Sequence, residues 1–267
     1  MGILNVTPDS FSDGGSFANV ADAVDHALGM IEDGACIIDV GGESTRPGAA
    51  PVSADQQIAR TQPVIEHLRR AGDVLISIDT TSSVVAEAAL DAGADIINDV
   101  SAGQDDERML PLAAQRACGL VLMHRLTSPV QESYSDQYAQ DPIYEDVVAT
   151  VCEFLMRRCE AATSLGVDHA AITIDPGLGF GKSKEHNLEL IRHTTDIVQL
   201  GFPVLSAASR KSFVGSVTNV ALPSKRVIGS TAVSVANWLN GVYLFRVHDV
   251  SPHREALAVA AAIRPHQ

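Results

Sequence analysis

The chain has 267 residues, of which 46% are hydrophobic and 19% charged, a composition that is ordinary for a globular protein with one sizeable core. Its net charge of −14 argues against a general nucleic-acid-binding protein, which normally carries a basic face. No apolar run approaches the roughly 18 residues that a membrane-spanning helix needs, and no signal peptide is evident. We therefore expect no membrane association and a cytoplasmic location.

Short apolar segments alternate with longer amphipathic ones along the chain, a pattern typical of parallel strands joined by helices. The predicted strands lie at 2–5, 35–42, 74–80, 94–100, 119–124, 170–176, 202–207 and 242–249. The predicted helices lie at 20–33, 54–71, 82–92, 107–117, 142–165, 185–199, 227–240 and 252–263. Eight strand–helix repeats favour an α/β fold of the (β/α)8 TIM-barrel type over an open sheet. No linker divides the chain, so we expect a single domain over residues 1–267.

A polar side chain stands at the end of each predicted strand. These residues are Asn5, Asp39, Asp79, Asn98, His124, Asp175, Ser209 and the pair Arg246 and His248. The carboxyl ends of all eight strands meet at one face of a barrel, where barrel enzymes keep their active sites. One such residue is commonly a turn or helix cap, but capping does not explain eight of them at one face. We therefore expect a polar pocket at this mouth.

Acidic and amide groups would enter the pocket from three strands, at Asp79, Asn98 and Asp175. Facing inward, these groups suit a flat heterocycle that carries amino, ring-NH and carbonyl groups. For Asp79 an alternative is that its side chain caps the helix that follows.

Basic groups would gather at the ends of the seventh and eighth strands. They are Arg210, Lys211, Arg246 and His248. Barrels frequently bind phosphate at this place, and arginine and histidine suit a polyanion. For Arg210 the alternative is a solvated surface charge.

Three glycine-containing loops follow predicted strands: VTPDSFSDGG at 6–15, GGESTRPGA at 41–49 and DPGLGFGKS at 175–183. The last loop does not have the spacing of a phosphate-binding P-loop. The sequence also contains neither an HExxH metal motif nor a GxSxG nucleophile elbow, so it gives little support to a metalloprotease or a serine hydrolase.

Taken together and in order, these motifs carry a family resemblance. The motifs NVTPDSFSDGG, DVGGESTRPGA, SIDT, IINDVS, LMH, IDPGLGFGK, SRKSF and RVHDV closely resemble the dihydropteroate synthase family of pterin-binding barrels. The similarity runs from residue 2 to about residue 249. It implies a transferase that joins p-aminobenzoate to 6-hydroxymethyl-7,8-dihydropterin diphosphate, releasing pyrophosphate and giving 7,8-dihydropteroate in folate biosynthesis. It also implies Mg²⁺, a homodimer and competition by sulfonamides.

The resemblance assigns roles to residues that match the family motifs. The catalytic residues would be Asp175, Lys211, Arg246 and His248. The pterin would be held by Asp79, Asn98, Asp175 and Lys211. The pyrophosphate would be held by Asn5, Arg246 and His248, with Asn5 also binding Mg²⁺. The p-aminobenzoate pocket would be lined by Phe11, Asp13, Thr45, Arg46, Pro47, Phe180, Lys211 and Ser212. The loops 6–15 and 43–49 would close over the pocket as a lid, with Gly14 and Gly15 as its hinge.

One position departs from the family pattern. The family usually has a methionine after LMH, packed near the pterin, and this chain has Arg125 there. We expect Arg125 either to point outward or to pair with an acid. The loop that follows it is long and contains Tyr134 and Tyr138, so it is a candidate cover for the site.

Two other readings of the motifs remain. A methyltetrahydrofolate methyltransferase would share the pterin contacts but has no use for SRKSF, RVHDV or the two lid loops. A paralogue that binds pterins without turnover would keep the same residues. For the homodimer, the sequence offers the apolar residues Val233, Val235, Ala236 and Trp238 near the last helices, although this face could equally pack on the barrel.

Overall fold

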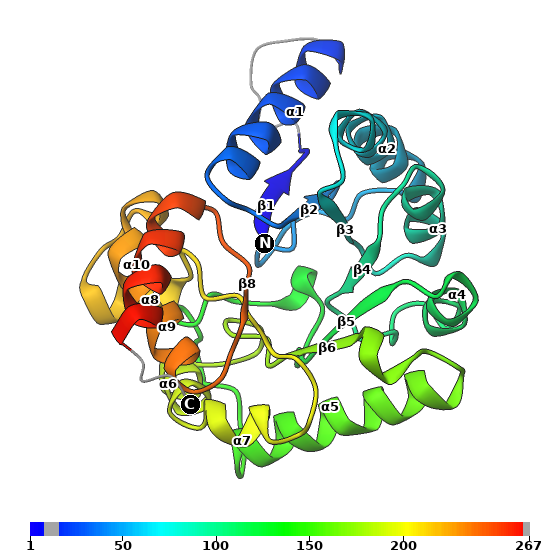
Figure 1. The fold of residues 1–267 in the computed structure, drawn as a ribbon. Helices are drawn as coiled ribbons and strands as arrows, with labels where there is room; N and C mark the ends of the chain where they lie inside the picture. The colour runs from blue at the N-terminus through cyan, green and yellow to red at the C-terminus, as the bar shows by residue number, and fades with distance from the viewer. Residues whose placement is uncertain (8–15, 264–267) are drawn as a thin grey trace.

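The computed structural model describes residues 1–7 and 16–263, and it shows a ring of parallel strands enclosed by helices (Figure 1). The strands are β1 (Gly2–Asn5), β2 (Ile37–Gly41), β3 (Leu75–Asp79), β4 (Ile96–Asp99), β5 (Gly119–Met123), β6 (Ile172–Asp175), β7 (Leu205–Ser206) and β8 (Leu244–Phe245). The helices are α1 (Ser16–Glu32), α2 (Ala54–Ala71), α3 (Ser83–Asp91), α4 (Met109–Arg116), α5 (Val147–Ser164), α6 (Lys184–Arg192), α7 (Thr194–Val198), α8 (Ser212–Thr218), α9 (Val227–Leu239) and α10 (Val250–Ile263). The predicted α/β barrel is confirmed.

The ring is closed by a few backbone contacts on either side of the last two strands. Strands β1 to β6 form one parallel sheet in sequential order, and β7 pairs in parallel with β8. A single bridge joins Ile174 of β6 to Val204, and another joins Gly2 of β1 to Val247. These contacts complete the barrel, and with it the common mouth at the carboxyl ends of the strands.

Most helices lie where the periodicity predicts them, and the differences have local causes. The fifth helix begins at Val147 rather than at 142, because Asp146 caps it by accepting the N–H of Ala149 at 2.9 Å. The predicted helix at 185–199 is interrupted at His193 and forms α6 and α7. Helix α8 was not predicted, since its seven residues are too short to show a helical period.

The strands separate an apolar layer from a polar interior. Leu4, Ile38 and Ile76 are completely buried and belong to the core that packs against the helices. Side chains alternate along a strand, so their neighbours face the barrel interior, and among these are the buried Asp39 and Ser77. The interior of this barrel is therefore polar toward its mouth.

The outer layer answers one question left open by the sequence. Val233 and Trp238 of α9 pack against the core, so part of the apolar face near the last helices covers the barrel. Elsewhere in α9, Ile228 is exposed. Within residues 1–7 and 16–263 no helix is both long and apolar enough to cross a membrane.

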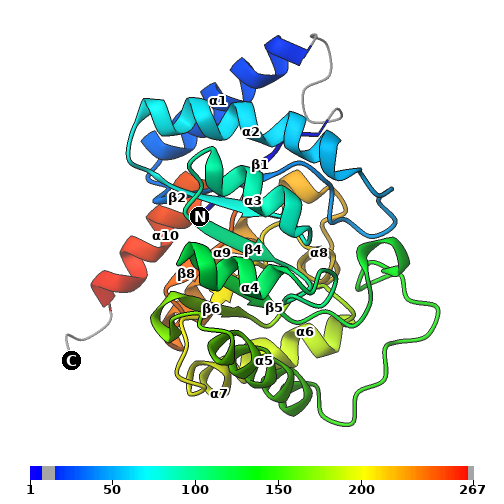
Figure 2. The same ribbon diagram turned by 90° about the vertical axis from the view of Figure 1, so that its right-hand side faces the viewer.

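One long connection stands out from the barrel. The segment between β5 and α5, residues 124–146, extends outward in the side view, where it is coloured green (Figure 2). It contains a short 3-10 helix at Pro129–Gln131. Because it follows the carboxyl end of β5, this β5–α5 loop lies at the mouth.

Candidate active site

Neighbouring strands place their last inward side chains at one level of the mouth. The register pairs Asn5 with Gly41, Gly41 with Asp79, and Asp79 with Asn98. Gly41 has no side chain, and a Cβ built there would lie 3.6 Å from Cβ of Asp79 and 3.7 Å from Oδ1 of Asn5. The structure thus brings Asn5, Asp79 and Asn98 to one rim and leaves room between the first two.

Arg246 reaches across the barrel from the end of β8 to two carboxylates. Its Nε donates to Oδ2 of Asp39 and its Nη2 to Oδ2 of Asp79, both at 2.6 Å. Nδ2 of Asn98 donates to Oδ2 of the same Asp39 at 3.2 Å. Asp39 therefore orients both Arg246 and Asn98. The sequence marked Asp39 as a polar strand end but gave it no role, and complete burial of an acid is a signal that only the fold reveals.

Asp79 has one oxygen available to a ligand. Its Oδ1 is buried, and no described residue hydrogen-bonds to it. Burial raises the pKa of Asp79, while Arg246 opposes the rise. Because a buried acceptor without a partner is costly, this oxygen marks the place where a bound molecule would donate an N–H or O–H.

Asp175, Lys211 and Phe180 form a second group at the mouth. Oδ1 of Asp175 accepts the backbone N–H of Gly177 at 2.7 Å. Nζ of Lys211 donates to the carbonyl oxygen of Leu178 and lies 4.4 Å from the centre of the Phe180 ring. Burial lowers the pKa of Lys211 to about 8, although Asp175 opposes this. Burial also raises the pKa of Asp175, with Lys211 opposing.

His248 is held by Ser209, which lies three residues beyond the end of β7. The backbone N–H of His248 donates to Oγ of Ser209 at 3.1 Å, and Nδ1 of His248 lies 3.0 Å from the same oxygen. Burial lowers the pKa of His248 to about 3, and Arg210 adds to the effect. His248 is therefore a neutral imidazole at neutral pH. Arg210 itself is paired with Asp249 at 2.5 Å.

The loop 43–49 follows β2 and is anchored at both ends. Glu43 accepts the N–H of Val52 at 2.7 Å, and the N–H of Gly48 donates to the carbonyl of Pro129 in the β5–α5 loop at 2.9 Å. Arg46 is exposed, while the predicted pocket residues on either side of it, Thr45 and Pro47, are half-buried. Phe11, Asp13 and the proposed hinge Gly14 and Gly15 lie outside the described residues.

Ser212 is tied to the β5–α5 loop. Its Oγ accepts the N–H of Ser135 at 3.0 Å, and Oγ of Ser135 accepts a hydrogen bond from Asn187 at 3.1 Å. Asn187 also accepts the N–H of Gly179 at 2.6 Å. Three loops, those after β5, β6 and β7, are thereby joined around the predicted p-aminobenzoate pocket.

The position that departs from the family pattern, Arg125, is the second residue of the same loop. Arg125 pairs with Asp105 of the β4–α4 loop, and its side chain is 8% exposed against 40% for Asp105. Of the two alternatives that the sequence left open, the structure shows pairing with an acid.

Lys182 is a fully buried residue that was not among the predicted site residues. Nζ of Lys182 lies 2.9 Å from Nδ1 of His124 and 2.8 Å from the carbonyl oxygen of Phe180. No local pattern predicts this burial, because a lysine after a glycine-rich loop is usually solvent-exposed.

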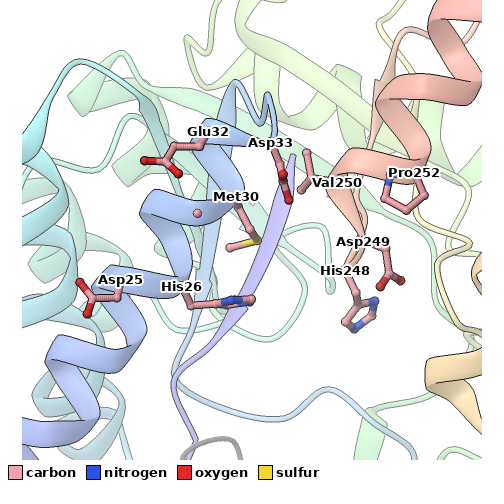
Figure 3. Close-up of a pocket in the computed structure, with 10 residues that line it drawn as sticks. Asp25, His26, Met30, Glu32, Asp33, His248, Asp249, Val250 and Pro252 are labelled. Atoms are coloured by element: carbon pink, nitrogen blue, oxygen red, sulfur yellow. The ribbon is translucent and has the colours of Figure 1, made fainter.

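A separate cleft of about 490 Å³ lies between α1 and the start of α10. Asp25, His26 and Met30 line it from α1, and His248 and Asp249 face them from the other side (Figure 3). Of the predicted site residues, His248 alone is among the described residues that line this cleft. Its several acidic side chains do not suit a polyanion.

The acidic, histidine and cysteine side chains of the described residues do not gather into a metal-binding cluster. Within residues 1–7 and 16–263 no group of three or more His, Cys, Asp or Glu side chains could hold a metal ion.

The chain is similar in sequence to a known protein family and to several characterised proteins. The family model described as pterin binding enzyme matches residues 1–248. Dihydropteroate synthase from Streptococcus pyogenes is 46% identical over 264 residues, which cover 98% of this chain and 94% of that protein. The protein of that name from Mycobacterium leprae is 42% identical over 267 residues, which cover 98% of this chain and 92% of that one.

Solved structures agree in fold. Dihydropteroate synthase from Xanthomonas albilineans with 4-aminobenzoic acid has a TM-score of 0.91 and 42% identity, and the match covers 100% of this chain and 93% of that one. The enzyme of the same organism in complex with 7,8-dihydropteroate has a TM-score of 0.88 and 39% identity, covering 100% and 94%. The Yersinia pestis enzyme with a sulfonamide drug has a TM-score of 0.91 and 39% identity, covering 100% and 94%.

Proposed function

The chain belongs to the dihydropteroate synthase family of pterin-binding enzymes, and we propose that its barrel mouth binds and activates the substrates of that reaction as follows. The reaction joins 6-hydroxymethyl-7,8-dihydropterin diphosphate to p-aminobenzoate, and it yields 7,8-dihydropteroate and pyrophosphate for folate biosynthesis. The observation that carries the site assignment is the buried, unpartnered Oδ1 of Asp79 beside Asn98 at the barrel mouth.

The pterin ring would lie on Asp79, Asn98 and Asp175. Asp79 Oδ1 would accept a ring or amino N–H, and Asn98, whose Nδ2 is committed to Asp39, would accept another with its side-chain carbonyl. Lys211 would donate to the ring carbonyl from the other side. Each polar edge of the heterocycle then meets a complementary group.

The diphosphate would lie at the ends of β1 and β8, near Asn5, Arg246 and His248. Neutral His248, oriented by Ser209, can donate from Nε2, and Arg246 supplies positive charge. Mg²⁺ usually takes one or two protein oxygens together with substrate phosphates and water, so the amide oxygen of Asn5 is a fitting donor. When bound there, the ion neutralises charge on the leaving pyrophosphate.

The p-aminobenzoate would occupy the side formed by Phe180, Lys211 and Ser212, with the loop residues Thr45, Arg46 and Pro47. Because Ser212 Oγ already accepts the Ser135 N–H, its own proton is free to be donated to a carboxylate. Phe11 and Asp13 complete the proposed pocket. Sulfonamides, which resemble this substrate, would compete here.

The residue types suit dissociative chemistry. The bond from the pterin methylene carbon to the diphosphate oxygen breaks, pyrophosphate leaves with the electron pair, and the carbocation is stabilised by the buried Asp175. The aryl amine then forms the new C–N bond and loses a proton to solvent. Positioning and electrostatics supply most of the acceleration, with no covalent enzyme intermediate.

The test is pyrophosphate release in the presence of pterin diphosphate, p-aminobenzoate and Mg²⁺. We expect release that depends on p-aminobenzoate and falls by about 100-fold or more in Lys211→Ala and in Asp175→Asn. Asp168→Asn is the matched control, because Asp168 caps a short helix before β6, at the opposite end of that strand.

Two outcomes would overturn the assignment. Tight binding of the pterin diphosphate without release would identify a non-catalytic paralogue. Activity with methyltetrahydrofolate in place of these substrates would identify a methyltransferase.

Location and assembly complete the proposal. All four cysteines lie in the described chain and are free, as in most proteins of a reducing cytoplasm, where we place this enzyme. We also propose a homodimer formed through the exposed apolar residues of the C-terminal elements, such as Ile228, Tyr243 and Val259, which are 85%, 74% and 61% exposed.

A further inference from the structure

Lys182 is completely buried, although lysine is almost never fully buried without partners. Its Nζ lies 2.8 Å from the carbonyl oxygen of Phe180, 2.9 Å from Nδ1 of His124 and 3.4 Å from the carbonyl oxygen of His124. These three acceptors match the three N–H donors of an ammonium group. Because the side chain has no exposed surface and each of its donors has an acceptor within the protein, its role is exerted through the residues that it holds.

The loop that carries Lys182 packs directly on backbone. A Cβ built at Gly177 would lie 1.8 Å from the carbonyl oxygen of His124, and one built at Gly181 would lie 2.2 Å from Cβ of Leu126. Both glycines have positive φ, of 67° and 64°. The loop 177–182 therefore lies against the start of the β5–α5 loop with no side chain between them, and Lys182 fastens the two together.

Two lysines contact Phe180, one at its backbone and one at its ring. Its carbonyl oxygen accepts from Lys182, and Nζ of Lys211 lies over its ring. Burial lowers the pKa of Lys182 to about 7, with Asp175 opposing and Lys211 adding to the effect. Because both the amine and the ammonium form carry N–H donors, the bond to Phe180 persists in either state.

We propose that Lys182 is a positioning residue that fixes Phe180 for recognition of p-aminobenzoate. The inference rests on the function proposed above and adds a determinant of the second substrate's affinity. Lys182 acts on the p-aminobenzoate side because its contacts are with Phe180 and with the end of β5. The pterin side keeps its own contacts, since Asp175 retains the N–H of Gly177.

The test compares Lys182→Met and Lys182→Gln with the unmodified enzyme. Lys182→Met keeps the length of the side chain and removes every donor, so we expect the KM for p-aminobenzoate to rise about tenfold or more. The dissociation constant of the pterin diphosphate, measured by calorimetry, should change less than about threefold. Lys182→Gln retains an N–H donor for the Phe180 carbonyl, and a smaller rise in KM is expected.

Lys184→Met is the matched control. Lys184 is two residues further along the chain, pairs with Glu185 at 3.3 Å and is 42% exposed, so its loss should leave both constants unchanged. If the unmodified chain shows no p-aminobenzoate-dependent release, the proposed function itself fails. If it is active but Lys182→Met keeps the original KM and loses only melting temperature, or if neither Lys182 variant folds, Lys182 is purely structural and the inference is overturned.

Discussion

Asp79 shows how one residue can be costly for folding and useful for binding. Its carboxyl is buried, its pKa is raised by that burial, and Arg246 is shared with Asp39. We predict that Asp79→Asn weakens binding of the pterin diphosphate about 10- to 100-fold, since a hydrogen bond to a charged group contributes roughly 1.5–3 kcal/mol. The melting temperature should stay the same or rise, because Arg246 keeps its partner Asp39.

Calorimetry and thermal unfolding would measure these two effects. The matched control is Asp95→Asn, which removes the charge that pairs with Arg69 and weakens the acceptor of the Ile76 N–H, and should lower stability without changing pterin binding. If Asp79→Asn bound the pterin diphosphate with unchanged affinity, the Asp79 carboxylate would not be part of the binding site.

We expect the protonation of Lys211 to determine how kcat/KM falls at alkaline pH. Its pKa is lowered to about 8, so the side chain carries its proton below that pH and loses it above. A neutral amine no longer supplies a positive charge to the ring carbonyl and the p-aminobenzoate pocket, and kcat/KM should fall about tenfold per pH unit above this value. In Lys211→Arg, whose guanidinium does not deprotonate in this range, the remaining activity should stay flat to about pH 10. A flat profile in the unmodified enzyme would contradict the prediction.

At the scale of elements, the loops after β4 and β5 are joined by Arg125 and Asp105. The β4–α4 loop is itself rigid, because the buried Asp99 accepts the N–H groups of Ser101 and Gly103, each at 2.7 Å. We predict that Arg125→Met, which restores the residue usual in the family, leaves pterin binding within about threefold and costs about 1 kcal/mol of stability or less.

Hydrogen exchange should locate the effect of that substitution. Amides of the β5–α5 loop should exchange faster in Arg125→Met, while those of β5 stay protected. Loss of pterin affinity by more than about tenfold would mean that Arg125 itself lies against the ring.

For the whole molecule, the proposed homodimer gives a direct prediction. Ile228 is 85% exposed on α9, and Ile228→Asp would place a charge in an apolar interface. We expect light scattering to show a dimer for the unmodified chain and a folded monomer for the variant, with circular dichroism unchanged. A monomeric unmodified chain at micromolar concentration would refute this assembly.

The barrel and its mouth follow largely from the sequence because alternation and polar strand ends are local patterns. Asn5, Asp79 and Asn98 share one rim because parallel register repeats from strand to strand. The partners of these residues depend on contacts far apart in the chain, so the role of Asp39 and the burial of Lys182 left no local pattern to read. The seven-residue α8 also could not be predicted, because it is shorter than two full periods of a helix.

Arg246 joins residues that are 207 and 167 positions away in the chain, Asp39 and Asp79 respectively. During synthesis the first strands leave the ribosome long before β8 does. Until β8 has been synthesised, Asp39 and Asp79 have no arginine with which to pair. Their carboxylates therefore stay hydrated in the incomplete barrel. Molecules that bind at this mouth would accordingly find no target on a growing polypeptide and would act only after translation of β8 is complete.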